Sequence, residues 1–170
     1  MANKYLLKPV LKTVKQAFYL EDESGKTIYE GKMTKFKFFT ASPFEFINHI
    51  TNTTEIHKVG KTVSLEQGGN DMISFMSKKS YFKYDGKKIW DYLHDKGIRI
   101  ESTLSGNKVG MSYTVSLEGK EIAKISTSSP KGKSLISTDL YYDVTCEEKD
   151  LDLVFLTAFS IAKTDQTFYD

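Results

Sequence analysis

A cluster of lysines lies just before the only tryptophan of the chain. The tryptophan is Trp90, and the lysines are Lys78, Lys79, Lys83, Lys87 and Lys88. Ammonium groups beside an aromatic side chain are typical of surfaces that contact anionic lipid headgroups, where each lysine contributes about 1 kcal/mol. The same pattern fits ordinary solvated strand faces, with Trp90 anchoring a helix to a sheet. Arginine, which binds phosphate through two N–H groups, occurs once against 23 lysines, and this favours the second interpretation.

A second basic segment interleaves lysines with phenylalanines. Its lysines are Lys32, Lys35 and Lys37, and its aromatic residues are Phe36, Phe38 and Phe39. Residues 1–100 hold 17 Lys and Arg against 11 Asp and Glu, whereas residues 101–170 hold 7 against 11, so charge is polarised along the chain. Phe36 and Phe38 could stack nucleic-acid bases but suit a protein interior equally well. The net charge of +2 gives no strong attraction to nucleic acid, and we expect none to bind.

Cys146 is the only cysteine, which excludes an intramolecular disulfide and a multi-cysteine zinc site. It lies on the apolar face of an alternating segment, which indicates a small buried side chain rather than a nucleophile. A hydrolase that uses Cys146 or an acidic pair is nevertheless the alternative enzyme class. A nucleophile would need a histidine partner and an orienting acid, and the sequence does not give their geometry.

The densest acidic cluster consists of Glu147, Glu148, Asp150 and Asp152. It could hold a divalent cation or act as an acid–base pair, but carboxylates here also suit the positive end of a following helix. The three histidines, His49, His57 and His94, share no metal-ligand spacing, although His49 and His57 could approach in a hairpin. The chain has no G-x-G-x-x-G or Walker-type motif. We expect no cofactor, no metal site and no enzyme activity.

Short alternating segments separated by turn residues predict antiparallel strands. In residues 111–118 and 140–147, apolar side chains alternate with polar ones, which is typical of a strand with one buried face. Shorter copies contain Val63 with Leu65 and Phe18 with Leu20. Turns are predicted at residues 24–25, 68–70, 85–86, 105–106 and 118–119. This spacing predicts ten to twelve short strands.

Two segments predict helices instead. Residues 87–97 place Ile89, Trp90 and Leu93 on one side of a short helix that ends at Gly97. Residues 151–162 are apolar nearly all round, and a helix of this kind has to be buried on every side. We therefore predict a mainly β fold: a closed antiparallel barrel of about twelve strands around this C-terminal helix, with one short surface helix. The alternative is an open sheet that leaves Phe155 or Phe159 facing water.

The length of 170 residues fits a single domain, 1–170. The segment 1–14 is interrupted by Lys8, Pro9 and Lys12, and no window reaches the roughly 18 apolar residues of a spanning helix. We expect no transmembrane segment and a cytoplasmic location. Because the helix would fill the barrel, an internal ligand cavity is not expected, and a site should lie on the outer wall or at a barrel mouth.

Four stretches of the chain resemble the tubby C-terminal domain group, which includes phospholipid scramblases and plant LURP-one-related proteins, and most closely its bacterial tubby-like branch. They are FYLEDESGKTIYEGK (18–32), HKVGKTVSLE (57–66), YFKYDGKKIWDYLHDKGI (81–98) and YYDVTCEEKDLDLVFLTAFSIA (141–162). The resemblance implies a barrel of about twelve strands that encloses the helix. It also implies a membrane-tethering role, since tubby domains bind phosphoinositide headgroups through basic residues outside the barrel.

These expectations combine into one functional prediction. The chain is expected to be a non-enzymatic binding module that contacts an anionic membrane surface or a protein partner. The residues expected to carry anion or lipid binding are the five lysines of residues 78–88 together with Trp90.

Overall fold

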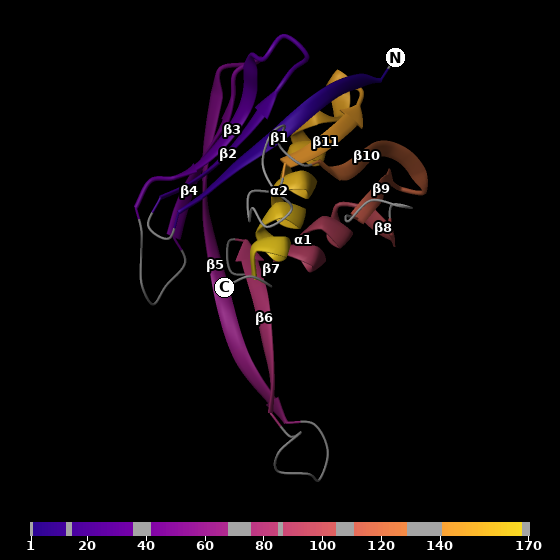
Figure 1. Ribbon diagram of the computed structural model, residues 1–170. Coiled ribbons are helices and arrows are strands. Elements are labelled where there is room, and N and C mark those ends of the chain that lie inside the picture. Colours follow the sequence, from indigo (N-terminus) through magenta and orange to yellow (C-terminus); the bar gives the residue numbers. More distant parts are fainter. Residues whose placement is uncertain are drawn as a thin grey trace.

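The computed structural model describes residues 2–12, 15–35, 42–67, 76–84, 87–104, 111–128 and 141–167. Within these residues, eleven strands form one antiparallel sheet (Figure 1). The strands are β1 (Asn3–Lys12), β2 (Lys15–Glu21), β3 (Thr27–Met33), β4 (Ser42–Asn48), β5 (Thr53–Gln67), β6 (Met76–Tyr84), β7 (Lys87–Lys88), β8 (Ile98–Leu104), β9 (Met111–Leu117), β10 (Lys120–Ser128) and β11 (Tyr141–Cys146). The helices are α1 (Ile89–Asp95), the short 3-10 helix η1 (Glu148–Asp150) and α2 (Leu151–Thr167). The predicted mainly β class is confirmed.

Neighbouring strands in the sheet follow the chain, with one long-range junction. The order is β7-β6-β5-β4-β3-β2-β1-β11-β10-β9-β8, so the first strand pairs with the last. Tyr5 lies opposite Val144 in this junction. The two ends of the sheet are therefore β7 and β8, which are consecutive in sequence and connected by α1.

The closed barrel of about twelve strands is not observed. The described residues form eleven strands, and they contain no ladder between β7 and β8. The physical reason is the connection between these two strands. Helix α1 contacts β6, β7 and β8, and its backbone hydrogen bonds are made within the helix, so it cannot continue a ladder of strands.

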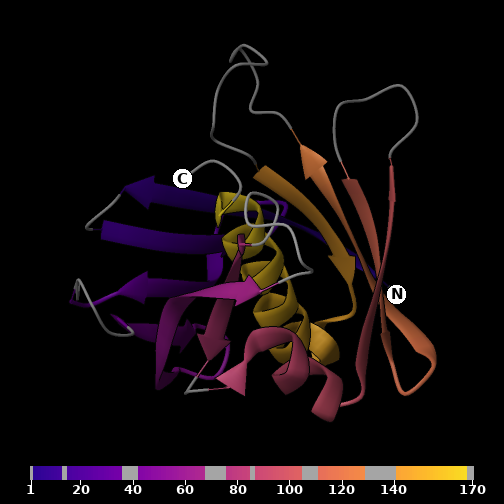
Figure 2. The same cartoon turned by 90° about the horizontal axis from the view of Figure 1, so that it is seen from below.

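Helix α2 lies in the concave interior of the sheet, and Figure 2 shows the strands and α1 arranged around it. All side chains at residues 154–163 are buried, including Phe155 at 2% exposure and Phe159 at 0%. Over the described residues the sheet is open, as in the alternative, but the alternative also expected one of these two rings to face water, and that part is wrong. The helix begins at Leu151 as predicted but continues past Ala162 to Thr167.

The rings of α2 pack mainly against strands β2, β3 and β4. The Phe159 ring lies 4.7 Å from that of Phe18 and 5.6 Å from that of Phe44, and the Phe155 ring lies 5.1 Å from that of Tyr29. The other side of the helix contacts β10, β11 and β1. Burial of each large aromatic side chain contributes about 1.5–3 kcal/mol, so this cluster is a major source of stability.

Polar groups of α2 are satisfied inside the core. Thr157 Oγ1 donates to the Leu153 carbonyl and Ser160 Oγ to the Leu156 carbonyl, both at 2.7 Å. Lys163 is buried as well, and its Nζ donates to Gln16 Oε1 at 2.7 Å and lies 5.7 Å from the Phe44 ring centre. The bond to Gln16 offsets part of the cost of burying an ammonium group.

Strand alternation in β11 follows the prediction. Tyr142, Val144 and Cys146 are each 1% exposed, whereas Asp143 between them is exposed. Phe18 and Leu20 on β2 are also fully buried. The side chains of Val63 and Leu65, and all of Leu140, lie outside what the structure describes.

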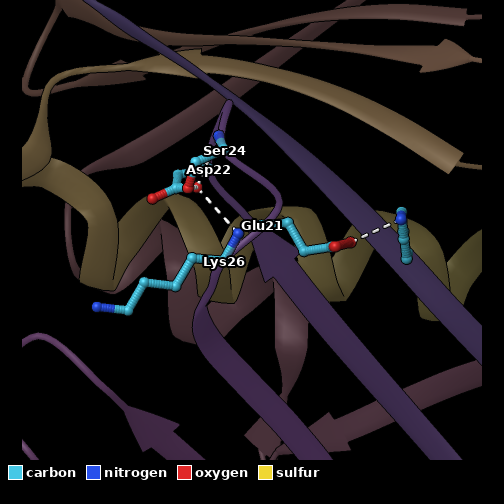
Figure 3. A network of polar contacts seen from close by, with 5 residues as sticks. Glu21, Asp22, Ser24 and Lys26 are labelled. Atoms are coloured by element: carbon cyan, nitrogen blue, oxygen red, sulfur yellow. Dashed lines mark hydrogen bonds and ion pairs between the residues drawn. The ribbon is translucent and has the colours of Figure 1, made fainter.

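Two predicted turns are confirmed by hairpins. Between β2 and β3, Asp22 Oδ1 accepts from the Ser24 backbone and hydroxyl at 2.9 and 2.6 Å and from the Lys26 N–H at 3.0 Å (Figure 3). The hydrogen bond from the Ser24 hydroxyl is the main reason that the pKa of the Asp22 carboxyl is lowered. Between β9 and β10, Glu118 and Gly119 both have positive φ, as a two-residue hairpin turn requires. The turns predicted at residues 68–70, 85–86 and 105–106 lie outside the described residues.

Helix α1 lies across the ends of the sheet. Ile89 and Leu93 are buried, four residues apart on the inner face, whereas Trp90 is 42% exposed. The prediction that Trp90 shares the inner face is wrong, because one residue corresponds to a turn of about 100° around a helix. Gly97 ends the helix with φ +86, as predicted. Among the described residues, no helix has the length and apolar character needed to cross a bilayer.

Candidate functional site

Three of the predicted lysines are brought close together by strand pairing. Lys83 on β6 is the direct partner of Lys88 on β7, and Tyr84 is the partner of Lys87. Trp90 follows in the first turn of α1. The side chains of Lys87, Lys88 and Trp90 are exposed. We call Lys87, Lys88 and Trp90 the lysine–tryptophan surface.

Acidic residues on α1 partly neutralise this surface. Lys87 Nζ forms an ion pair with the Asp95 carboxylate, and Asp91 is exposed on the same helix. Both groups of the ion pair are more than half exposed, so the pair is screened and contributes little to stability. Because the pair is weak, Lys87 can exchange Asp95 for another anion at small cost.

The other predicted lysines do not lie at this point. Lys78 and Lys79 pair with Leu65 and Ser64, near the end of the β5–β6 hairpin that extends from the body (Figure 1). At about 3.3 Å per residue, Lys79 is roughly 13 Å along the strand from Lys83. The structure does not describe the side chains of Lys78, Lys79 and Lys83.

The second basic segment is separate from the first. Lys32 is on β3, opposite Glu45, and β3 lies three strands from β6 in the sheet. Lys35 is exposed just beyond β3. Lys37 and the phenylalanines at 36, 38 and 39 lie outside the described residues.

Cys146 is a core residue. It is 1% exposed and lies opposite Asn3 and Ala123 on the two neighbouring strands. Burial, with smaller contributions from Asp150 and Glu147, raises the pKa of its thiol to about 12. The thiol is therefore protonated at neutral pH, which disfavours a role as nucleophile.

The acidic cluster forms the entry to α2. Glu148 and Asp150 belong to η1, Asp152 to the first turn of α2, and Lys149 Nζ lies 3.4 Å from Glu147 Oε2. The carboxylates thus lie near the positive end of the helix dipole. In the part of the chain that the structure describes, no group of three or more His, Cys, Asp or Glu side chains is arranged to hold a metal ion.

His49 and His57 each contact a different glutamate. His49 Nε2 is 3.2 Å from Glu30 Oε1, and His57 Nε2 is 3.1 Å from Glu55 Oε2. Both belong to the β4–β5 hairpin, the arrangement in which they could approach, but His57 lies opposite Phe44 while His49 is in the turn. His94 is exposed on α1.

A pocket of about 290 Å³ lies where the beginning of α2 meets α1 and the β4–β5 hairpin. We call it the α2 pocket. Its aromatic lining comes from four elements and consists of Tyr29, Phe46, Tyr92 and Phe155. Its charged lining consists of Glu55, Lys96 and Asp152. The sequence gives no local signal for this site, because the segments that line it are spread over residues 29–156 of the chain.

Asn48 connects the two sides of the α2 pocket. Its Nδ2 donates to the Tyr29 hydroxyl at 2.6 Å and to Asp152 Oδ1 at 3.4 Å. Its Oδ1 accepts from the backbone N–H groups of Ile50 and Thr51 at 2.9 and 3.2 Å. The side chain is therefore held in one orientation by both the hairpin turn and α2.

Comparison with family models, with curated proteins and with solved structures found no match to this chain.

Proposed function

We propose that this chain is a non-enzymatic, tubby-like binding module whose lysine–tryptophan surface contacts anionic phospholipid. The proposal is supported by the exposed Trp90 beside Lys87 and Lys88, with Lys83 paired to Lys88. An exposed indole suits the interfacial region of a bilayer, and ammonium groups are attracted to its anionic headgroups. The resemblance to the tubby group supports the same role by analogy of fold.

The filled interior supports binding at the outside rather than catalysis within. Residues 154–163 of α2 occupy the space that the sheet surrounds, and all of them are buried. The alternative of a hydrolase that uses Cys146 has little support, because its thiol is buried and its pKa is raised to about 12. The alternative ligand for the same exposed surface is a protein partner.

Vesicle co-sedimentation tests the proposal. The full chain is mixed with phosphatidylcholine vesicles that contain or lack phosphatidylserine, at low and at high salt. We expect binding only to the anionic vesicles and a loss of binding at high salt, because exposed charges are screened. Binding that does not depend on phosphatidylserine would contradict the proposal.

Matched charge variants locate the surface. Lys87→Glu with Lys88→Glu is expected to abolish binding, and Trp90→Ala to weaken it. The control is Lys4→Glu with Lys26→Glu, which makes the same change in net charge at two exposed lysines on β1 and in the β2–β3 turn. Equal loss in both double variants would mean that only net charge matters, and that would reject the assigned surface.

A further inference from the structure

The α2 pocket has a buried apolar floor and a charged rim. Tyr29, Phe155 and Leu156 line it and are 5%, 2% and 9% exposed. Glu55, Lys96 and Asp152 line it and are exposed. A concave apolar surface with a few polar groups converging on it is the usual form of a small-molecule site. The volume of about 290 Å³ suits a small ligand.

Aromatic side chains make up much of the lining. Phe155 is central among them, since its ring centre lies 5.1 Å from that of Tyr29 and 6.1 Å from that of Phe46. Tyr92 joins them from α1. Aromatic ring faces attract cations, and several rings around one space are the usual way in which proteins recognise quaternary ammonium groups.

One ammonium group of the protein already uses this chemistry. Lys96 Nζ lies 5.0 Å from the centre of the Tyr92 ring, at the rim of the pocket. Lys96 is exposed, so its side chain can move away into solvent at little cost. The contact marks a place where a cation is favoured and where Lys96 would compete with a bound one.

The carboxylates on the rim favour the same charge. Asp152 and Glu55 outnumber Lys96 among the ionised lining groups, which makes the mouth net acidic. Asp152 is held by Asn48, and Glu55 contacts His57 through Oε2. An anionic ligand would meet two carboxylates here, whereas a cation would meet two opposite charges at the mouth and aromatic rings below.

We infer that the α2 pocket binds a small organic cation of the quaternary-ammonium class. The aromatic side chains take the methylated ammonium group, and Asp152 and Glu55 neutralise its charge. This site is separate from the lysine–tryptophan surface, and the inference does not rest on the proposed binding of anionic lipid. The same ammonium chemistry occurs in a free cation such as choline and in a phosphocholine headgroup.

The probe is choline, and its neutral isostere 3,3-dimethyl-1-butanol is the matched ligand. Each is titrated into the isotopically labelled full chain, and NMR shifts of the Asn48 side-chain amide and of the Thr51 and Thr53 backbone amides are followed. We expect saturable shifts with choline and much smaller ones with the isostere. Equal shifts with the two ligands would overturn the inference, because the pocket would then recognise shape alone.

Two variants of opposite charge sharpen the test. Asp152→Asn should weaken choline binding by about fivefold, and Lys96→Gln should strengthen it by a similar factor, since it removes the competing ammonium group. The controls Glu121→Gln and Lys124→Gln make the same charge changes at exposed positions on β10, outside the α2 pocket. Weaker binding in Lys96→Gln would overturn the inference.

A second titration separates the two sources of the ligand. Glycerophosphocholine carries the same ammonium group beside a phosphate. Shifts at the same amides with both compounds would support the inference with a headgroup as ligand. Shifts with choline alone would support it with a free cation as ligand. Absence of shifts with both would overturn it.

Discussion

The two α-helices, α1 and α2, differ in how much of their surface they bury against the same sheet. α2 buries every side chain at residues 154–163, whereas α1 buries Ile89 and Leu93 and leaves Trp90 exposed. The cause is in their sequences, because α2 has no polar face and α1 has one narrow apolar stripe. The interior helix therefore provides stability, and groups free to meet a ligand gather on α1 and at the beginning of α2.

The largest expected effect comes from placing a charge on each helix. Phe155→Asp should prevent soluble folding, since an unpaired carboxylate at a 2% exposed position costs more than about 5 kcal/mol. Trp90→Asp on α1 should cost about 1–2 kcal/mol and leave the protein folded. Urea unfolding followed by circular dichroism checks both. A folded Phe155→Asp protein with unchanged stability would remove the contrast.

The buried ammonium of α2 gives an intermediate effect. Lys163→Met should lower stability by about 1–3 kcal/mol, because Gln16 Oε1 loses its 2.7 Å donor while remaining buried. Adding Gln16→Leu should recover much of this loss, since both polar groups are then removed. A thermodynamic cycle of the two single variants and the double variant measures the coupling. Additive effects would mean that the hydrogen bond contributes nothing.

The buried thiol at the end of β11 gives a pH-dependent prediction. Burial raises the pKa of the Cys146 thiol from its ordinary value of 9.0 to about 12, so the folded state keeps a proton that the unfolded state loses. Stability should therefore fall as pH rises from 9 towards 12, by up to about 1.4 kcal/mol per pH unit from this group. Cys146→Ala removes this part of the slope. Identical slopes in wild type and variant would contradict a buried protonated thiol.

The smallest effect is expected on the surface of α1. Asp95→Asn removes the ion pair with Lys87, and both groups are more than half exposed. Exposed pairs contribute about 0–1 kcal/mol, and less at high salt. Thermal melts at low and high salt should therefore differ little between wild type and variant. A loss above about 2 kcal/mol would show that α1 is held by charge rather than by Ile89 and Leu93.

The sequence predicts the interior helix well and its surroundings less well. The all-apolar segment that starts at Leu151 favours burial on all sides over an open-sheet arrangement with an exposed ring, and burial is confirmed for residues 154–163. The predicted end at Ala162 is wrong, because a lysine at position 163 is expected to be exposed to solvent and so to end the buried segment. In the fold, Gln16 lies beside Lys163 and accepts a hydrogen bond from it, which the sequence alone does not show. Local pattern likewise gives no reason for β1 to pair with β11 or for α1 to separate the sheet ends.

Of the two candidate sites, one is partly visible in the sequence and the other is not. The lysines and Trp90 are visible as a cluster in sequence, but strand register decides that Lys83 joins Lys88 while Lys79 lies further along the hairpin. The α2 pocket has no counterpart in sequence. Tyr29, Asn48 and Asp152 are brought together only by the sheet and the buried helix.

Hydrogen–deuterium exchange of backbone amides tests the enclosure of α2 most directly. We predict that amides at residues 154–163 exchange only through global unfolding, with a free energy equal to that from urea denaturation. The amides of α1 should exchange faster, through local opening. Exchange in α2 as fast as in α1 would contradict a helix surrounded by the sheet.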